Sequence, residues 1–437
     1  MKFHPFSFAL IAFALFFSCN NTDDPNDPQD NPESNKPNIL LVIADDMGLD
    51  AAPGYSIGNL KPNMPTLQSM MTSGIKFNNL WSNPTCTPTR GTIITGKYGF
   101  RTNVTQVGDV MSTSEVSLQT HLDNTNSGYN HAVIGKWHLA NNDANHPTNM
   151  GVDYYAGNLG GGIPSYTNWN LTENAQTNTS TEYATTKYTN LAIDWIDEQT
   201  QPWFLWVAYN AAHTPFHLPP NDLHFQGNLP SGQASIDANP LPYYLAMLEA
   251  MDTEMGRLIS SMSDAERNNT IIIFIGDNGT PNQVAQEYLS TRVKGSLFQG
   301  GVNVPMVISG KNVSRINAIE DALINTTDLF ATISELVGNS TSTINDSKSF
   351  KDLLTSSNAN TRNYVYAERG AVGAQDYTIR NATHKYMYFD NGNERLFNLS
   401  VDPLETTNLL NANQLPLSAA DIAMKDELIA ELNSIRN

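Results

Sequence analysis

The chain of 437 residues has little positive charge, with 24 lysines and arginines against 43 aspartates and glutamates and a formal net charge of −19. A general nucleic-acid binder needs a basic surface, so the composition argues against that class. An anionic ligand is repelled at long range and has to be held by a local basic pocket. The sequence also lacks internal repeats and any histidine and cysteine cluster with the ligand spacing of a zinc site.

Cysteine is scarce, with Cys19 and Cys86 as the two examples. Residues 6–17 form an apolar run too short to span a bilayer comfortably, and Cys19 follows as in a bacterial lipoprotein cleavage site. We therefore expect a signal peptide over residues 1–18 and a lipid anchor on Cys19, rather than ordinary secretory cleavage nearby. The Asn-, Asp- and Pro-rich residues 19–36 predict a disordered tether. The expected location is the outer membrane, facing the periplasm or the cell surface, which leaves Cys86 without a disulfide partner.

Several continuous apolar runs are typical of strands buried on both faces of a parallel sheet. They lie at residues 38–44, 132–135, 203–209 and 270–275. Residues 243–262, between the last two runs, keep the apolar spacing of a helix. Strands that alternate with helices indicate an α/β fold, and polar residues follow each run where such folds place their sites. We expect this domain to cover residues 37–358.

The pattern of apolar residues changes after about residue 358, where short β-prone segments replace the long apolar runs. Residues 390–392 (Asp-Asn-Gly) carry a turn signal between two of these segments, and residues 418–435 have a helical pattern. We therefore predict a smaller C-terminal antiparallel α+β domain over residues 359–437.

Cys86 begins the segment Cys-Thr-Pro-Thr-Arg, in which Pro88 suits the first turn of a helix and Gly96 suits its end. The start of a helix favours an anion. Arg90 shares the face of Cys86 one turn away, where its planar fork can hold an oxyanion. A buried structural cysteine near a surface arginine is the simpler alternative.

Two pairs of polar residues each follow a buried strand: Asp45 with Asp46, and Asp277 with Asn278. Adjacent carboxylates repel one another unless a cation or strong donors neutralise them. Three carboxylates and an amide oxygen suit Ca²⁺ or Mg²⁺. Helix caps and Asx turns are the alternative for one pair, but two such pairs on parallel strands favour a metal site.

Four basic side chains stand in or beside the predicted strand ends and loops: Lys136, His138, His213 and Lys294. Lys136 and His138 are two residues apart and point the same way if their segment is extended. Each of the four alone is more often a solvated or packed residue. Together with a cation site they form an anion pocket in an otherwise acidic protein.

These blocks, in this order, resemble the formylglycine-dependent type I sulfatases of the alkaline phosphatase superfamily over nearly all of the chain after the tether. The resemblance rests on the residues already named and on further blocks at residues 38–46, 86–90, 135–138, 212–215, 276–279, 300–305 and 396–405. It implies an alkaline phosphatase-like fold, with a mixed and mostly parallel sheet flanked by helices.

The resemblance also implies roles for the site residues. A maturation enzyme would oxidise Cys86 to formylglycine (3-oxoalanine), whose hydrate is the nucleophile. One Ca²⁺, with Mg²⁺ less expected, would be held by Asp45, Asp46, Cys86, Asp277 and Asn278. Arg90 would activate the nucleophile, Lys136 and Lys294 would bind sulfate oxygens, His213 would protonate the leaving alcohol and His138 would take the proton of the hydrate.

Two positions depart from the family pattern. Thr89 stands where serine is frequent, which weakens the case for efficient maturation, and Gln299 stands where glutamate is frequent, which alters a contact expected with Lys294. Four further residues are candidates for the pocket rim: His217, Arg292, Glu368 and Arg369.

The expected substrate is a sulfated carbohydrate, a polysaccharide or an oligosaccharide, and the expected activity is that of a sulfuric ester hydrolase. Two alternatives remain open from the sequence. One is a phosphonate monoester or phosphodiester hydrolase of the same superfamily. The other is a non-catalytic protein that binds sulfated glycans and keeps Cys86 as a thiol.

Overall fold

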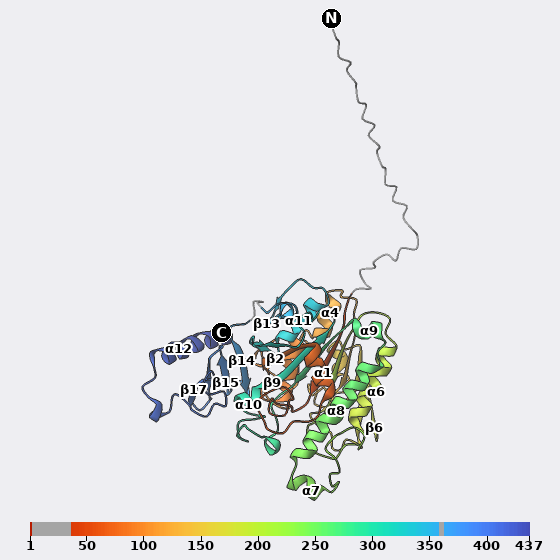
Figure 1. Cartoon of the computed structure of the whole chain (residues 1–437), viewed down its shortest axis with the longest axis horizontal. Helices are drawn as coiled ribbons and strands as arrows, with labels where there is room; N and C mark the ends of the chain where they lie inside the picture. Colours follow the sequence, from red (N-terminus) through yellow and green to blue (C-terminus); the bar gives the residue numbers. More distant parts are fainter. Residues whose placement is uncertain (2–35, 358–361) are drawn as a thin grey trace. The chain divides into compact units, whose positions relative to one another are not determined.

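The computed structural model describes Met1, residues 36–357 and residues 362–437 (Figure 1). Within these ranges eleven strands form the main sheet, in the order β10-β2-β9-β8-β1-β7-β3-β4-β5-β6, with β11 also paired to β2. The strands are β1 (Asn38–Ala44), β2 (Gly74–Trp81), β3 (Asn130–Gly135), β4 (Tyr154–Gly157), β5 (Trp169–Glu173), β6 (Gln176–Ser180), β7 (Trp203–Ala208), β8 (Thr270–Gly276), β9 (Asn303–Gly310), β10 (Ala318–Glu320) and β11 (Ile324–Asn325). The central pairs β8-β1, β1-β7, β7-β3 and β3-β4 are parallel, while β9 pairs antiparallel with β2 and β8.

The α-helices that accompany this sheet are α1 (Pro65–Ser73), α2 (Cys86–Thr95), α3 (Gly99–Thr102), α4 (Leu118–Asn124), α5 (His146–Asn149), α6 (Ala184–Asp197), α7 (Gln233–Ala238), α8 (Leu241–Ser261), α9 (Asp264–Asn268), α10 (Gln299–Val302) and α11 (Asp328–Leu336). Helices α1, α6 and α8 pack on one face of this sheet and α2, α4 and α11 on the other, and the remaining helices lie in the connections. Figure 1 shows α6 and α8 side by side along the sheet. The long apolar runs of the sequence follow from this arrangement, since a strand covered on both sides needs apolar residues at every position.

Strand β1 shows how one segment serves two cores. Its even residues Leu40 and Val42 pack in a cluster with α1, α6 and α8. The odd residues Ile39, Leu41 and Ile43 pack on the opposite face, in a cluster with α2, α4 and α11. Successive side chains of a strand point to opposite faces, so the run is fully buried without a break in its apolar pattern. These two cores fix the end of β1, where the site begins.

A second sheet of four antiparallel strands follows in the chain. Its strands are β14 (Val365–Arg369), β15 (Asp376–Arg380), β16 (His384–Tyr388) and β17 (Glu394–Asn398), in that order. Helix α12 (Ala419–Arg436) packs on this sheet through Leu428 and Leu432 (Figure 1). The side chain of Ser418 caps the start of α12 by accepting a hydrogen bond from the backbone N–H of Asp421. Short two-stranded pairing also joins β12 (Thr343–Ile344) to β13 (Ser347–Lys348).

The predicted fold class is confirmed, with the mostly parallel main sheet, the flanking helices and the C-terminal antiparallel sheet all present. The helix expected over residues 243–262 is α8, and the closing helix expected over 418–435 is α12. Lys36–Asn437 forms one compact unit, and the division into domains of residues 37–358 and 359–437 stays a prediction.

The signal peptide, Cys19 and nearly all of the tether lie outside the described residues. Across the part of the chain that the structure covers, no helix has the length and apolar character needed to cross a membrane.

Candidate active site

The two acidic pairs meet at one edge of the main sheet. Ala44 at the end of β1 lies opposite Gly276 at the end of the parallel strand β8, so Asp45 and Asp277 follow in register. The backbone N–H of Asp46 donates to Oδ1 of Asp277 over 3.1 Å, and Nδ2 of Asn278 donates to Oδ1 of Asp46 over 2.8 Å. All four side chains are buried. The structure therefore brings the two pairs together at the ends of β1 and β8.

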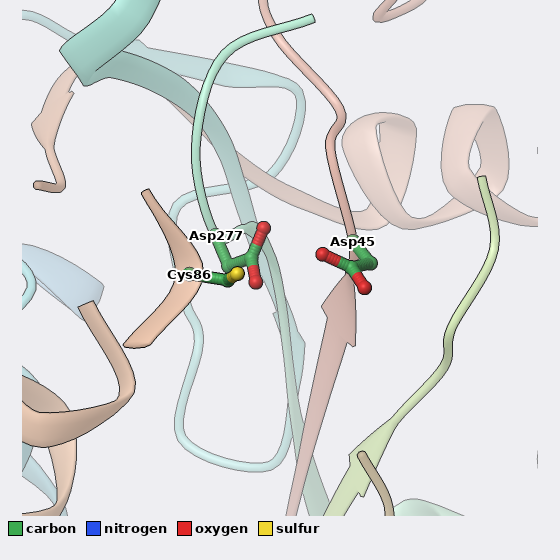
Figure 2. A group of neighbouring side chains, drawn as sticks. All are labelled: Asp45, Cys86 and Asp277. Carbon is green, nitrogen blue, oxygen red and sulfur yellow. The ribbon is translucent and has the colours of Figure 1, made fainter. Parts of the chain in front are cut away.

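Cys86 begins helix α2 and points into this cluster. Thr85 is extended at the start of the helix, and Gly96 ends it in the left-handed conformation at φ 63°. Ligand atoms of Asp45, Cys86 and Asp277 lie within 4.8 Å of one another, and Figure 2 shows the three side chains facing a common centre. In the structure Cys86 is a buried, free thiol.

Three cationic side chains surround the carboxylates. Nζ of Lys136 lies 2.6 Å from Oδ2 of Asp45, and Nζ of Lys294 lies 2.6 Å from Oδ2 of Asp46. The fork of Arg90 donates from Nη2 to Oδ2 of Asp277 over 2.8 Å and from Nη1 to the carbonyl of Lys136 over 2.7 Å.

The site opens in one direction. The side chains of Arg90, Lys136, Asp45 and Asp277 are 0% exposed, whereas those of Lys294 and His213 are 23% and 21% exposed. A ligand therefore meets Lys294 and His213 first.

The acidic cluster contains buried oxygen atoms that a cation could bind. Burial raises the pKa of Asp45 to about 8, against the lowering effect of Lys136. Burial opposes ionisation of Asp46 as well, but Lys294 and His213 hold the pKa of Asp46 below its usual value. Oδ1 of Asp45 and Oδ1 of Asn278 are buried without a hydrogen-bond partner. Buried oxygen atoms of this kind, beside three carboxylates, are the donors that a hard divalent cation takes.

The two predicted histidines both lie at the site, beside the adjacent glycines Gly161 and Gly162. Nδ1 of His138 is 3.2 Å from Sγ of Cys86, and Nε2 of His213 is 3.9 Å from Oδ2 of Asp46. The extended segment expected from Lys136 to His138 is wrong, because His138 adopts a left-handed backbone with φ 60°. This turn brings the imidazole to the thiol, while Lys136, directly after β3, reaches Asp45.

Comparison with known proteins identifies the family to which the chain belongs. The sulfatase family model matches residues 37–339. The chain belongs to the sulfatase family. Mouse arylsulfatase J is 28% identical over 329 residues, an alignment that covers 69% of this chain and 53% of the mouse protein. The arylsulfatase of Klebsiella aerogenes is 23% identical over 411 residues, covering 70% of this chain and 88% of that one. The chain thus spans about half the length of the mouse relative.

Solved structures share the sulfatase fold. The crystal structure of Ps i-CgsB has a TM-score of 0.76 at 24% identity, with 90% of this chain and 92% of that chain covered. The structure of BT4656 in complex with its substrate D-glucosamine-2-N,6-O-disulfate has a TM-score of 0.73 at 18% identity, with coverages of 92% and 98%. At these identities the likeness establishes the fold.

The two departures from the sulfatase pattern have local explanations. Oγ1 of Thr89 accepts from the backbone N–H of Asn83 over 3.1 Å, so the threonine hydroxyl anchors the chain entering α2. Oε1 of Gln299 accepts from the indole N–H of Trp81 over 3.1 Å. The hydrogen bond found for the Gln299 side chain is thus with Trp81, whereas Lys294 is bonded to Asp46.

The four rim candidates differ in position. Glu368 is buried and binds the backbone N–H of Phe100 over 2.8 Å, so it is a packing residue of the C-terminal sheet. Arg369 donates to the carbonyl of Gly295, beside Lys294, and Arg292 donates to the carbonyl of Glu405.

His217 is connected to the site by Tyr166, which contacts both His217 and His213. Its ring centroid is 4.1 Å from that of Tyr166, and the Tyr166 hydroxyl donates to the carbonyl of His213 over 2.8 Å.

Two supporting residues of the site were not predicted from the sequence. Tyr166 orients the segment of His213, and its spacing to that histidine carries no periodic signal. Gly161 lies against His138 so closely that an added Cβ would be 2.4 Å from the imidazole. The run of three glycines at 160–162 was the available signal for such a close approach.

Proposed function

We propose that this chain is an exported sulfatase that removes sulfate from a sulfated carbohydrate. The observation that carries the proposal is the convergence of Asp45, Cys86 and Asp277 within 4.8 Å, at the start of a helix and beside three cations. A buried nucleophile position with this surrounding charge suits a tetrahedral anion, and family membership favours sulfate.

Ca²⁺ is the ion we propose for the site, with Mg²⁺ less favoured. Asp45, Asp46, Asp277 and Asn278 would hold it, together with an oxygen on the side chain at position 86. The unpartnered oxygens of Asp45 and Asn278 support this donor set, because Ca²⁺ takes several oxygen ligands. When bound, the ion supplies positive charge that polarises a sulfate oxygen and lowers the pKa of a ligated hydroxyl.

We further propose that a separate maturation enzyme oxidises Cys86 to formylglycine. Burial raises the pKa of the Cys86 thiol, so the unmodified side chain stays protonated and is a poor nucleophile. The hydrated aldehyde supplies one hydroxyl for attack on sulfur and a second whose deprotonation expels sulfate.

His138 is placed to accept the proton of that second hydroxyl. Its Nδ1 lies 3.2 Å from Sγ of Cys86, an atom that stands in for an oxygen on the same Cβ in the matured protein. Burial and the positive charge of Lys136 lower the pKa of His138 to about 2. The imidazole is therefore neutral in the free protein, and the negative charge of a bound sulfate ester would raise its pKa toward the range of an effective base.

His213 is placed to protonate the leaving alcohol. Its Nδ1 lies 2.8 Å from the carbonyl of Thr214, to which an Nδ1–H group donates, so Nε2 faces the site. Burial lowers the pKa of His213 to about 4 in the free protein. The negative charge of a bound sulfate ester raises that pKa and favours the proton-donating form. Lys136 and Lys294 would bind the other sulfate oxygens, and Arg90 would hold the nucleophile in place.

Related proteins support a carbohydrate substrate. Relatives include canine N-acetylgalactosamine-6-sulfatase, and the structures of similar fold include Ps i-CgsB in complex with k-i-k-neocarrahexaose. A lipid anchor on Cys19 and an outer-membrane location, facing the periplasm or the cell surface, complete the proposal and rest on the sequence pattern alone.

The test is release of inorganic sulfate from a panel of sulfated oligosaccharides, with matured protein and Ca²⁺. An aryl sulfate and an aryl phosphodiester or phosphonate of the same leaving group are assayed in parallel. We expect turnover of sulfate esters that is lost in Cys86→Ala. Faster turnover of the phosphorus esters would contradict the proposal in favour of the related hydrolase class. Binding of sulfated glycan without turnover by matured protein would mean a non-catalytic binder.

A further inference from the structure

The segment that carries Lys294 is tied to both halves of the site. We call residues 292–299 the Lys294 loop. The backbone N–H of Lys294 donates to the carbonyl of Thr280 over 3.1 Å, shortly after the pair Asp277 and Asn278 that follows β8. The next N–H, from Gly295, donates to the carbonyl of Pro84 over 2.8 Å, two residues before Cys86. The direction of the Lys294 ammonium group therefore depends on how this loop is held.

A buried ion pair from the C-terminal part of the chain contacts the same loop. Lys385 on β16 and Glu405, after β17, lie 2.7 Å apart, and their side chains are 0% and 1% exposed. Nζ of Lys385 also donates to the carbonyl of Leu297 over 2.6 Å. Oε2 of Glu405 accepts from the backbone N–H of Gln299 at 2.5 Å. The pair thus binds a carbonyl and an amide two residues apart on the loop.

Two arginines add to this attachment. Arg369 on β14 donates to the carbonyl of Gly295, and Arg292 donates to the carbonyl of Glu405. Glu405 has a φ of 58°, a conformation that a residue with a side chain rarely adopts without support from its surroundings. The C-terminal sheet holds the loop at residues 295 and 297, and Glu405, in the segment after the sheet, holds it at residue 299.

The pair has little reason to exist for stability alone. Removing two opposite charges from water costs free energy that their attraction often fails to return, and apolar replacement of such pairs is frequently neutral. A role in fixing geometry accounts better for two charges buried against the backbone of a loop whose lysine faces the site.

We propose that Lys385 and Glu405 are positioning residues, which set where the Lys294 ammonium group meets a sulfate group. The idea rests on the proposed function, in which Lys294 binds sulfate oxygens. It gives the C-terminal sheet a part in anion binding, although none of its residues need touch the substrate.

The experiment compares full-length, matured protein with a double variant, Lys385→Met with Glu405→Gln. This variant removes both charges together and keeps an acceptor for the N–H of Gln299. A matched control, Lys425→Met with Glu394→Gln, removes a more exposed pair of 2.7 Å separation in the same C-terminal region. Affinity for inorganic sulfate is measured by calorimetry, kcat and KM on a sulfate ester, and folding by thermal melting.

We expect the Lys385/Glu405 variant to bind sulfate about tenfold more weakly and the control within about twofold of wild type. In a Lys294→Ala background, the same pair of substitutions should change sulfate affinity by less than about twofold, because the lysine that they position is gone. A merely structural pair would weaken binding equally in both backgrounds.

Equal losses in both backgrounds, or unchanged affinity in the double variant, would overturn the inference. So would a wild-type protein that binds no sulfate. Failure of the proposed function looks different: sulfate binds and the coupling to Lys294 is present, but no sulfate ester is turned over.

Discussion

Replacing His213 by alanine removes the imidazole that we propose protonates the leaving alcohol. The substitution leaves the carboxylates in place, since His213 is 3.9 Å from Asp46 while Lys294 contacts the same oxygen at 2.6 Å. The side chain is 21% exposed, so truncation leaves a space that water can enter. The expected change is therefore in the chemistry rather than in the fold.

The magnitude depends on the leaving group. General acid catalysis contributes about 10²- to 10⁴-fold, which corresponds to about 3 to 5 kcal/mol in the barrier. A sugar alcohol leaves poorly without a proton, so His213→Ala should lose kcat/KM on a sugar sulfate by about this factor. A nitrophenol leaves well as an anion, so the loss on nitrophenyl sulfate should stay below about tenfold.

The assay measures kcat/KM for both substrates in wild type, His213→Ala and His217→Gln. His217 lies on the same segment but bonds to Tyr183 and to the carbonyl of Pro215, so its variant controls for general disturbance of this segment. An equal loss on the two substrates in His213→Ala would refute the acid role and indicate a binding role instead.

Three further predictions concern the ion, the pH and a glycine. Ca²⁺ at about one hundred times its Kd should stabilise the folded state by about 2.7 kcal/mol. Divided by the unfolding entropy of about 400 residues, this stabilisation raises the Tm by about 3 °C. In melting experiments Asp277→Asn should abolish the shift. Burial lowers the pKa of His217 to about 4, below the unfolded value of about 6.5, so the unfolded state binds the proton first as pH falls. His217 should therefore contribute a drop of up to about 3 kcal/mol in the free energy of unfolding between about pH 6.5 and pH 4. In denaturant titrations His217→Gln should remove this contribution and leave the similar ones of His213 and His138. Gly161→Ala should lower kcat with little change in Tm, because the added Cβ would lie 2.4 Å from the His138 imidazole. The control Gly232→Ala, with open space around it, should change neither kcat nor Tm. Equal activity of the two variants would contradict the contact between Gly161 and His138.

Much of the fold could be predicted because its strands are buried on both faces. The runs at 38–44 and 270–275 are apolar throughout, and the polar pairs after them had to meet once the strands were parallel neighbours. Helix α2 could be predicted as well, since Pro88 lies in its first turn and Gly96 follows its last residue.

Other features depended on tertiary contacts that carry no local pattern. The backbone of His138 is left-handed, because its imidazole turns toward Cys86 while its N–H donates to the carbonyl of Leu159. Glu368 looked like a rim residue from its charge, yet it is buried among hydrogen bonds of the C-terminal sheet. Charge and spacing alone do not separate a residue that faces a ligand from one that holds a neighbouring sheet.

The measurement that tests the central claim most directly is the mass of the Cys86 peptide in protein matured by its own host, with sulfate release assayed on the same sample. We predict an aldehyde, or its hydrate, at position 86 and Ca²⁺-dependent release of sulfate. An unmodified thiol in a sample that hydrolyses sulfate esters, or an aldehyde in a sample that does not, would contradict the account.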